Sequence, residues 1–162
     1  MNNFKYLRNN LTSLGIIIFI FFVDRFTKLW VISYVEKTEN NFSLFLTSFL
    51  NIELIWNEGI AFGILSFEQD RYYFLITIII LLVILLLFWW LVNSAGVEKF
   101  SLSLILGGAI GNVVDRIYFM AVPDFIDFHI NNFHWFVFNI ADIFITIGIT
   151  IMLINEFKKK ND

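Results

Sequence analysis

The sequence predicts a mainly α-helical membrane protein, built as one domain over residues 1–162 around a bundle of four membrane-spanning helices. The chain is 59% hydrophobic and only 15% charged, whereas a soluble domain of this length would be about half apolar and a quarter charged. It also contains windows of about 20 apolar residues, the length that a helix needs to cross the hydrocarbon core of a bilayer. The spans are expected at about residues 12–34, 72–92, 100–120 and 135–157.

The same composition excludes several other classes of protein. The 21 Phe, the single Pro and the absence of Cys exclude intrinsic disorder, a collagen-like repeat and a disulfide scaffold. Without Cys there is no thiol nucleophile, iron–sulfur cluster or thiolate zinc site. A formal charge of −3 gives no basic surface for nucleic acid. Any chemistry must therefore use oxygen and nitrogen groups.

The second window gives the clearest signal for a spanning helix. Residues 72–92 contain no charged side chain. Tyr72 and Tyr73 lie at one end of this window and Trp89 and Trp90 at the other, as expected of aromatic anchors at the two membrane interfaces.

The distribution of basic residues predicts that both termini are cytoplasmic. With this orientation, only Lys37 and Arg71 fall on the outer side. The outer segments are then about residues 36–71 and 121–134. The first contains N51-I-E-L-I-W56, whose partial alternation fits either a short strand at the surface or an ordinary loop. The inner side holds Lys5, Arg8, Lys99, Lys158, Lys159 and Lys160.

Ionisable side chains inside a span are costly, so those in the predicted spans are candidates for function. At 1.5 Å per residue, Lys28 and Asp24 lie about 10 and 16 Å below the outer end of the first span. Asp142 lies about 10 Å below Trp135, where the fourth span is expected to begin. Asp124 lies just outside the membrane. All of these groups are in the outer half, together with a set in the last two turns of the third span, Asn112, Asp115 and Arg116.

Several of these residues have a structural explanation. Asp24 and Lys28 are four residues apart, a spacing that places an acid and a base on one helical face as a favourable pair. Arg116 can be neutralised by Asp115 or by a carboxylate of another helix. The stretch G107-G-A-I-G111 favours close helix packing, because small residues let two backbones approach each other.

Asp124 and Asp142 differ from these residues, because neither has a basic residue within one turn along the sequence. If their segments converge, two carboxylates face each other with little water and share one proton, as in aspartic proteases. One group can then take a proton from an attacking water while the other donates one. The alternative stays open that Asp124 caps a turn after Pro123 and that Asp142 pairs with Arg116.

Other functions are less well supported by the residues. His129 and His134 are five apart without an H-E-x-x-H pattern, which disfavours a catalytic zinc. No G-x-S-x-G and no nucleotide-binding glycine pattern occurs. A proton-coupled transporter is disfavoured because the inner halves of the spans lack ionisable groups. A non-enzymatic membrane scaffold is as well supported as an enzyme at this point.

Five short blocks follow one another along nearly the whole chain: D24-R-F-T-K28, N57-E-G-I-A-F-G63, G107-G-A-I-G-N-V-V-D-R116, V122-P-D-F-I-D-F128 and F138-N-I-A-D142. Each block is weak alone, but their order and depth resemble the lipoprotein signal peptidase (signal peptidase II) family, the membrane aspartyl endopeptidases of bacteria. The resemblance therefore favours the enzyme over the scaffold and the transporter.

The resemblance implies a four-transmembrane-helix bundle with a small extracytoplasmic β-cradle and a surface helix, located in the cytoplasmic (inner) membrane of bacteria. It implies that the active site lies at the outer face, among membrane lipid, and uses no metal and no cofactor. The implied substrates are diacylglyceryl-modified prolipoproteins, cut on the N-terminal side of the lipidated Cys. Globomycin-type cyclic peptides are the implied inhibitors.

By match to the last two blocks, the resemblance implies that Asp124 and Asp142 are the catalytic pair. Asp115 is expected to have a structural role beside Arg116. The residues that carry over as substrate-binding or supporting are Asp24, Lys28, Asn57, Gly59, Gly108, Asn112, Asp115, Arg116, Asn139 and Ala141.

Two positions depart from the family pattern. Pro123 stands where relatives usually have an aliphatic residue, and its fixed φ and missing N–H could alter the backbone that leads into Asp124. Arg25 stands where Gln is more common, and we expect no effect on the chemistry. Neither departure removes a catalytic group.

Overall fold

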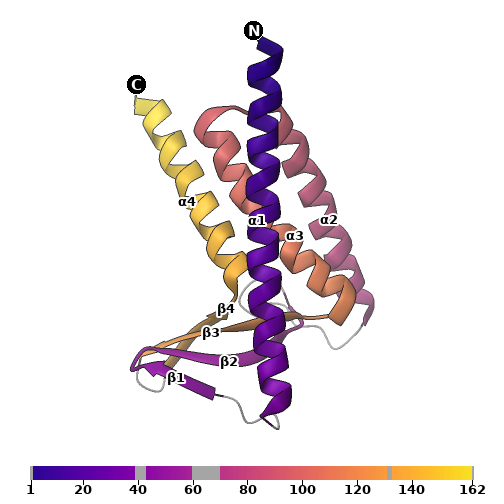
Figure 1. The fold of residues 1–162 in the computed structure, drawn as a ribbon, viewed down its shortest axis with the longest axis vertical. Helices are drawn as coiled ribbons and strands as arrows, with labels where there is room; N and C mark the ends of the chain where they lie inside the picture. The colour runs from indigo at the N-terminus through magenta and orange to yellow at the C-terminus, as the bar shows by residue number, and fades with distance from the viewer. Residues whose placement is uncertain (1, 39–42, 60–69, 131–132, 162) are drawn as a thin grey trace.

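The computed structural model describes residues 2–38, 43–59, 70–130 and 133–161, which form four helices and a four-stranded antiparallel sheet (Figure 1). Both chain termini lie at one end of the helices, and the sheet lies across the other end. The helices are α1 (Asn2–Lys37), α2 (Asp70–Asn93), α3 (Gly96–Phe119) and α4 (Ile140–Asn161). The strands are β1 (Ser43–Thr47), β2 (Leu50–Asn57), β3 (Val122–Ile130) and β4 (Phe133–Phe138), paired in that order.

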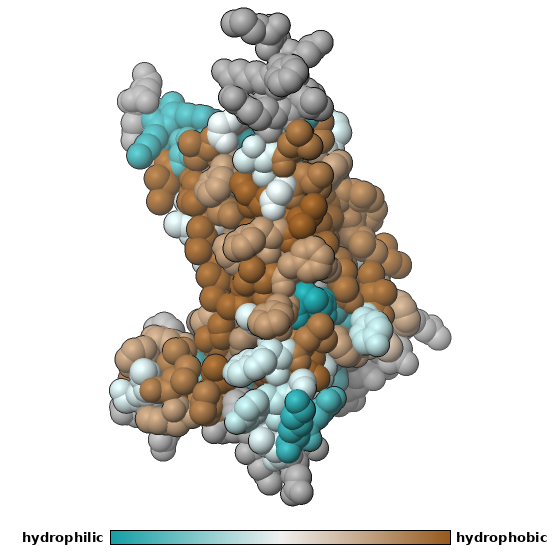
Figure 2. All heavy atoms as spheres, viewed as in Figure 1, coloured by the Kyte–Doolittle hydropathy of each residue, from teal (hydrophilic) through white to brown (hydrophobic). Residues whose placement is uncertain are grey.

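Helix α3 is the centre of the bundle and packs against the other three helices. Its most apolar stretch is 67% buried, whereas the corresponding stretches of α2 and α4 are only 11% buried. Leu102 and Leu106 of α3 are fully buried and meet Ile17 of α1 and Leu91 of α2. Figure 2 shows hydrophobic residues along the helices, with hydrophilic residues mainly towards the two ends. An apolar exterior of this kind suits contact with lipid rather than water.

Three helices of the described residues, α2, α3 and α4, are long and apolar enough to cross a membrane. Helix α1 is longer than any of them, with 36 residues, but it carries Asp24, Arg25 and Lys28 along its course. These charges are turned towards the bundle, since Asp24 and Lys28 are fully buried. The chain is thus a mainly helical membrane protein, as its composition predicts.

Glycines let α3 approach its neighbours, as the sequence predicts for residues 107–111. A Cβ added to Gly108 would collide with the backbone carbonyl oxygen of Ala141 in the first turn of α4. A Cβ on Gly111 would lie 2.6 Å from Asp24 Oδ2, and one on Gly107 would lie 2.9 Å from Cβ of Ile20. The charged residues of α1 and the start of α4 can reach α3 only because these side chains are absent.

The sheet includes the strand that the alternation of residues 51–56 allows, since β2 covers this stretch. Strand β3 lies between β2 and β4, and it runs through Pro123, which is paired in register with Trp56 of β2. The proline is therefore accommodated in an extended strand, and Asp124 follows it opposite Ile55. No surface helix occurs among the described residues, so this feature stays an expectation.

The expected start of the fourth span at Trp135 is wrong, because residues 133–138 form strand β4. This stretch is aromatic and β-branched, which suits a pleated surface, and it pairs with β3 from Phe133 to Phe138. Helix α4 instead begins after Asn139, whose side-chain Oδ1 accepts a hydrogen bond from the Asp142 N–H at 3.1 Å. Asp142 therefore lies in the first helical turn, not about 10 Å along the helix.

The packing at Gly108 predicts that Gly108→Ala lowers the free energy of unfolding by roughly 1–3 kcal/mol, because backbone atoms of α4 must move to admit the methyl group. We would measure unfolding in mixed micelles of increasing SDS content. Gly15→Ala in α1 is the matched control, since no atom lies within 4 Å of its added Cβ. The control should gain up to about 1 kcal/mol from helix propensity. Equal effects of the two substitutions would contradict this account of the packing.

Candidate active site

The site is built around a buried ammonium group on α1. Lys28 is 0% exposed, and its Nζ donates hydrogen bonds to Asp24 Oδ2 at 2.8 Å, Asn112 Oδ1 at 2.7 Å and Asp115 Oδ2 at 2.7 Å. An ammonium has three donors, so each of them has an oxygen partner here. The pairing of Asp24 with Lys28 predicted from their spacing is confirmed.

Asp115 belongs to the same charge network, but its ion-pair partners are Lys28 and Arg25 and not the adjacent Arg116. The two carboxylate oxygens of Asp115 are bound by Lys28 and by Arg25, whose Nη1 lies 2.6 Å from Asp115 Oδ1. Arg25 also donates to the carbonyl oxygen of Gly111 at 3.4 Å. Successive residues of an α-helix point about 100° apart, so Asp115 faces α1 while the adjacent Arg116 points away from it. Two acids and two bases thus balance each other between α1 and α3.

Arg25 is the site residue that sequence reasoning missed. Its partner lies 90 residues away along the chain, so no local pattern reveals the pair. The signal available was its place between Asp24 and Lys28 in a span where charges are costly.

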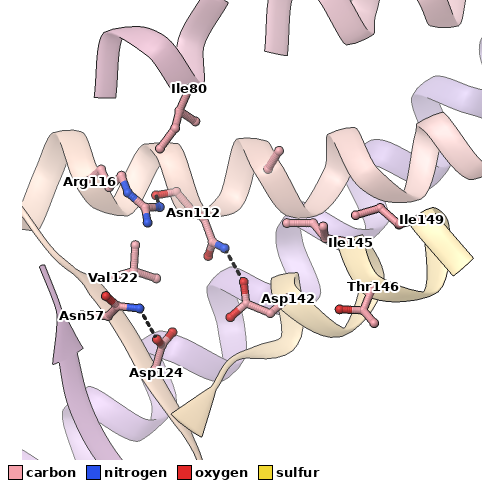
Figure 3. Close-up of a pocket in the computed structure, with 11 residues that line it drawn as sticks. Asn57, Ile80, Asn112, Arg116, Val122, Asp124, Asp142, Ile145, Thr146 and Ile149 are labelled. Carbon is pink, nitrogen blue, oxygen red and sulfur yellow. Dashed lines mark hydrogen bonds between the residues drawn. The ribbon is translucent and has the colours of Figure 1, made fainter. Parts of the chain in front are cut away.

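The hydrogen bond from Lys28 fixes the orientation of the Asn112 side-chain amide, and this amide in turn binds Asp142. Because Asn112 Oδ1 accepts from Lys28, its Nδ2 is left to donate, and it does so to Asp142 Oδ1 at 2.8 Å. Asp24 binds Lys28 through Oδ2, and its Oδ1 accepts a hydrogen bond from the backbone N–H of Ala141 at 2.9 Å. The first turn of α4 is therefore attached to α1 through Asp24 and to α3 through Asn112, and Figure 3 shows the second of these hydrogen bonds.

Asp124 approaches the same place from strand β3. Its Oδ2 accepts from Asn57 Nδ2 at 2.8 Å and its Oδ1 from Asn139 Nδ2 at 2.6 Å. Only 2% of Asp124 is exposed. Burial, and next the nearby charge of Asp142, raise the pKa of the Asp124 carboxyl to about 6. This carboxyl therefore binds a proton far more readily than one in water.

Asn139 connects the two carboxylates. Its side-chain Nδ2 donates to Asp124, while its backbone N–H donates to Asp142 Oδ2 at 3.2 Å. Together with the Asp142 N–H bonded to Asn139 Oδ1, this forms a reciprocal cap at the start of α4. The turn-cap alternative is wrong for Asp124, which lies within strand β3, while Asp142 receives hydrogen bonds from Asn112 and Asn139.

Arg116 and Gly59 form a second group of hydrogen bonds, which positions the side chain of Asn57. Arg116 Nη2 donates to the Gly59 carbonyl oxygen at 3.0 Å, and Nη1 donates to that of Asn112 at 3.3 Å. The Gly59 N–H in turn donates to Asn57 Oδ1 at 2.9 Å. The amide of Asn57 is thereby oriented with its Nδ2 towards Asp124. Of the predicted supporting residues, Asn57, Asn112 and Asn139 bind the two carboxylates directly, and the others contact these three residues, Lys28 or the first turn of α4.

A cavity of about 270 Å³ opens onto both carboxylates, between α2, α3 and α4 (Figure 3). Its polar lining comes from Asn57, Asn112, Arg116, Asp124 and Asp142, and its remaining walls are largely apolar, with Ile80, Val122, Ile145 and Ile149. A second, apolar groove of about 400 Å³ lies along the neighbouring face of α4, between this helix and the β3–β4 hairpin. Asp142 and Thr146 line both spaces.

Within the residues that the structure describes, no group of three or more His, Cys, Asp or Glu side chains is arranged to hold a metal ion. His129 lies with its Nδ1 3.3 Å from Asp127 Oδ2. Its backbone pairs with that of His134 in strand β4, but the side chain of His134 is outside the described part of the structure.

The fold and the site together define a helical membrane protein with a buried pair of amide-bound carboxylates. The family model described as signal peptidase (SPase) II matches residues 16–158. A lipoprotein signal peptidase of Pelagibacter ubique is 44% identical over 160 residues, covering 96% of each chain. One of Blochmanniella pennsylvanica is 40% identical over 167 residues, covering 99% of each.

A solved structure described as a bacterial membrane enzyme has the same fold, with a TM-score of 0.73 and 34% sequence identity, over 92% of this chain and 89% of the other. The chain therefore belongs to the lipoprotein signal peptidase family, signal peptidase II, whose members are aspartic peptidases. The resemblance seen in the five sequence blocks is confirmed.

The ion pair of Arg25 predicts that Arg25→Met lowers the free energy of unfolding by about 2 kcal/mol, because Asp115 is fully buried and loses one of its two cationic partners. Lys159→Met is the control, since Lys159 is 54% exposed and its pair with Glu98 spans 3.6 Å. The control should change stability by less than about 0.5 kcal/mol. SDS titration of both variants would check this, and an Arg25 variant as stable as the control would contradict it.

Proposed function

We propose that Asp124 and Asp142 are the catalytic pair of this signal peptidase II, and that they share one proton. The observation that carries the proposal is Asn139, which donates hydrogen bonds to both carboxylates and so holds them at one point. Two carboxylates in such a dry, crowded place do not both ionise readily, and the raised pKa of Asp124 follows from this.

In the proposed reaction, the ionised carboxylate takes a proton from a water as the water oxygen attacks the carbonyl carbon of the scissile peptide bond. The protonated partner donates its proton to the carbonyl oxygen, which gives a neutral tetrahedral diol. The C–N bond then breaks as the leaving nitrogen receives a proton from the pair and a diol hydroxyl returns one. The products are a new carboxyl terminus on the signal peptide and a free amine on the lipoprotein.

The proposed substrates are diacylglyceryl-modified prolipoproteins, cut on the N-terminal side of the lipidated Cys. The two spaces beside Asp142 support this, because a substrate with both an apolar peptide and acyl chains needs two apolar paths that meet at the reacting carboxylates. Substrate selection would then depend partly on the membrane, which keeps acyl chains at the depth of the pair. Globomycin-type cyclic peptides would compete for the cavity of about 270 Å³.

We also propose that α1 to α4 all span the inner membrane as one domain, with both termini cytoplasmic and the carboxylate pair and sheet at the outer face. The excess of Lys and Arg at the terminal end supports this orientation. A surface helix, which the family resemblance implies, completes the proposed architecture. A transporter is less well supported, because most buried charges gather at the sheet end of the bundle. Lys99, a buried charge at the terminal end, lies about four turns along α3 from Asp115, so these charges form no continuous path across the membrane.

The proposed pair predicts that Asp124→Asn and Asp142→Asn each lower turnover of a diacylglyceryl-modified prolipoprotein by at least about 1,000-fold, because each variant lacks one member of the acid–base pair. Asp127→Asn, a buried carboxylate on the same strand, is the matched control and should keep most of the activity. Cleavage would be measured on gels with purified protein in detergent, with and without a chelator. Full activity of either Asp124→Asn or Asp142→Asn, or loss of the unsubstituted protein's activity with the chelator, would contradict the proposal.

The raised pKa of Asp124 predicts that kcat/KM falls as the pH rises past about 6, because the pair loses the proton that it must donate. Asn57→Ala removes a donor that stabilises the charged form of Asp124, so the pKa rises and this fall moves to higher pH by about one unit. Asn51→Ala is the control, since this second Asn of β2 pairs with Asp127 in register. A midpoint in Asn57→Ala that is unchanged or lower would contradict the assignment.

A further inference from the structure

Thr146 of α4 lies beside the carboxylate pair but has no part in the hydrogen bonds described above. It follows Asp142 by one helical turn, so the two residues share one face of α4, about 6 Å apart along its axis (Figure 3). Both residues line the cavity that opens onto the carboxylates, and both line the apolar groove beside the β3–β4 hairpin. Thr146 therefore lies at the boundary between the two spaces that we assign to the substrate.

The two spaces differ in the chemistry of their walls. Isoleucine side chains of α4 line both of them, Ile145 and Ile149 in the cavity and Ile143 and Ile147 in the groove. Amides and a guanidinium also line the cavity, which suits the backbone of a peptide. Apart from Asp142 and Thr146, the described residues that line the groove are all Phe or Ile. The groove is therefore the better place for acyl chains.

The Thr146 hydroxyl has no hydrogen-bond partner in the part of the chain that the structure describes. Other hydroxyls of these helices donate to the carbonyl oxygen four residues earlier, as Thr77 does to Tyr73 at 2.9 Å and Thr150 to Thr146 at 2.8 Å. Thr146 is exposed, and α4 is proposed to span the membrane, where no water replaces a missing partner. Its hydroxyl is thus available to bind an acceptor of the substrate.

The proposed substrate carries such an acceptor at a matching distance. In a diacylglyceryl-modified Cys, about eight covalent bonds separate the scissile carbon from the nearer ester carbonyl, which spans up to about 9 Å when extended. This length covers the roughly 6 Å of helix between Asp142 and Thr146. The esters are also the last polar groups before the acyl chains, just as Thr146 is the last polar group before the apolar wall of the groove.

We propose that the Thr146 hydroxyl donates a hydrogen bond to an ester carbonyl of the diacylglyceryl group and so selects substrates whose chains are linked by esters. The inference rests on the function proposed above, because it concerns the substrate of the same site. Thr146 then holds the lipidated Cys beside Asp142 while the acyl chains follow the groove. It binds the substrate and takes no part in proton transfer.

The test compares two synthetic substrates with the same prolipoprotein peptide and the same chain length. One carries a diacylglyceryl group, and the other a dialkylglyceryl group, whose ether links have no carbonyl. The purified full-length protein in detergent should cleave the ester substrate with a kcat/KM about threefold to tenfold higher, the effect of one hydrogen bond between neutral groups. Both substrates are measured on one preparation, so the ratio does not depend on the fraction of folded protein.

Thr146→Val replaces the hydroxyl by a methyl group of similar size and should bring this ratio to about one. The change should come from a higher KM for the ester substrate, with kcat within about twofold, because the contact is the same before and during the reaction. Thr146→Ser should restore the preference. Thr150→Val is the matched control and should keep the full ratio, since the Thr150 hydroxyl is already bonded and lines neither space.

Equal kcat/KM for the two substrates in the unsubstituted protein would overturn this inference and leave the proposed function intact. An ester preference that persists in Thr146→Val would overturn it as well. A kcat/KM that falls equally for both substrates in Thr146→Val would assign the hydroxyl to the peptide instead of the lipid, and would also overturn it. Cleavage of neither substrate by the unsubstituted protein would contradict the proposed function, and this inference with it.

Discussion

The arrangement of this protein depends on the buried Lys28 ammonium and the three oxygens around it. Burying the charged Lys28 completely costs several kcal/mol in desolvation, and only partners with good geometry can offset this cost. Here two carboxylates and one carboxamide, from α1 and α3, surround it at 2.7–2.8 Å. Since water cannot replace a lost partner within the bilayer, α1 and α3 have little freedom to shift along each other at this depth.

Two of the groups that bind Lys28, Asn112 and Asp24, also position the proposed catalytic pair. Asn112 accepts from Lys28 and donates to Asp142, so one amide transmits the position of the ammonium to a carboxylate. Asp24 does the same for the backbone of α4 through Ala141. The pair itself is held differently, because the hydrogen bonds to Asp124 and Asp142 come from neutral amides. The Arg116 guanidinium lines the same cavity, but it donates its hydrogen bonds to the carbonyl oxygens of Gly59 and Asn112.

The membrane explains why these polar groups gather at one end of an apolar bundle. Helices α2 and α4 expose aliphatic side chains over most of their length, and α3 is enclosed between its neighbours. The sheet then closes the polar end, with β3 bringing Asp124 against the first turn of α4. The proposed lipid-anchored substrate would reach this place by lateral diffusion.

The sequence by itself determined the membrane class, the gathering of most ionisable span residues towards one end of the bundle, the Asp24–Lys28 pair and the family. These features depend on composition, on the four-residue helical spacing or on short blocks, which are all local. Only the tertiary structure decided that Asp115 binds Arg25 instead of Arg116, and that residues 133–138 pair with β3 instead of starting a helix. Partners about 90 residues apart depend on how the helices pack, and an aromatic stretch is equally apolar in a strand or a helix, so neighbouring elements make the choice.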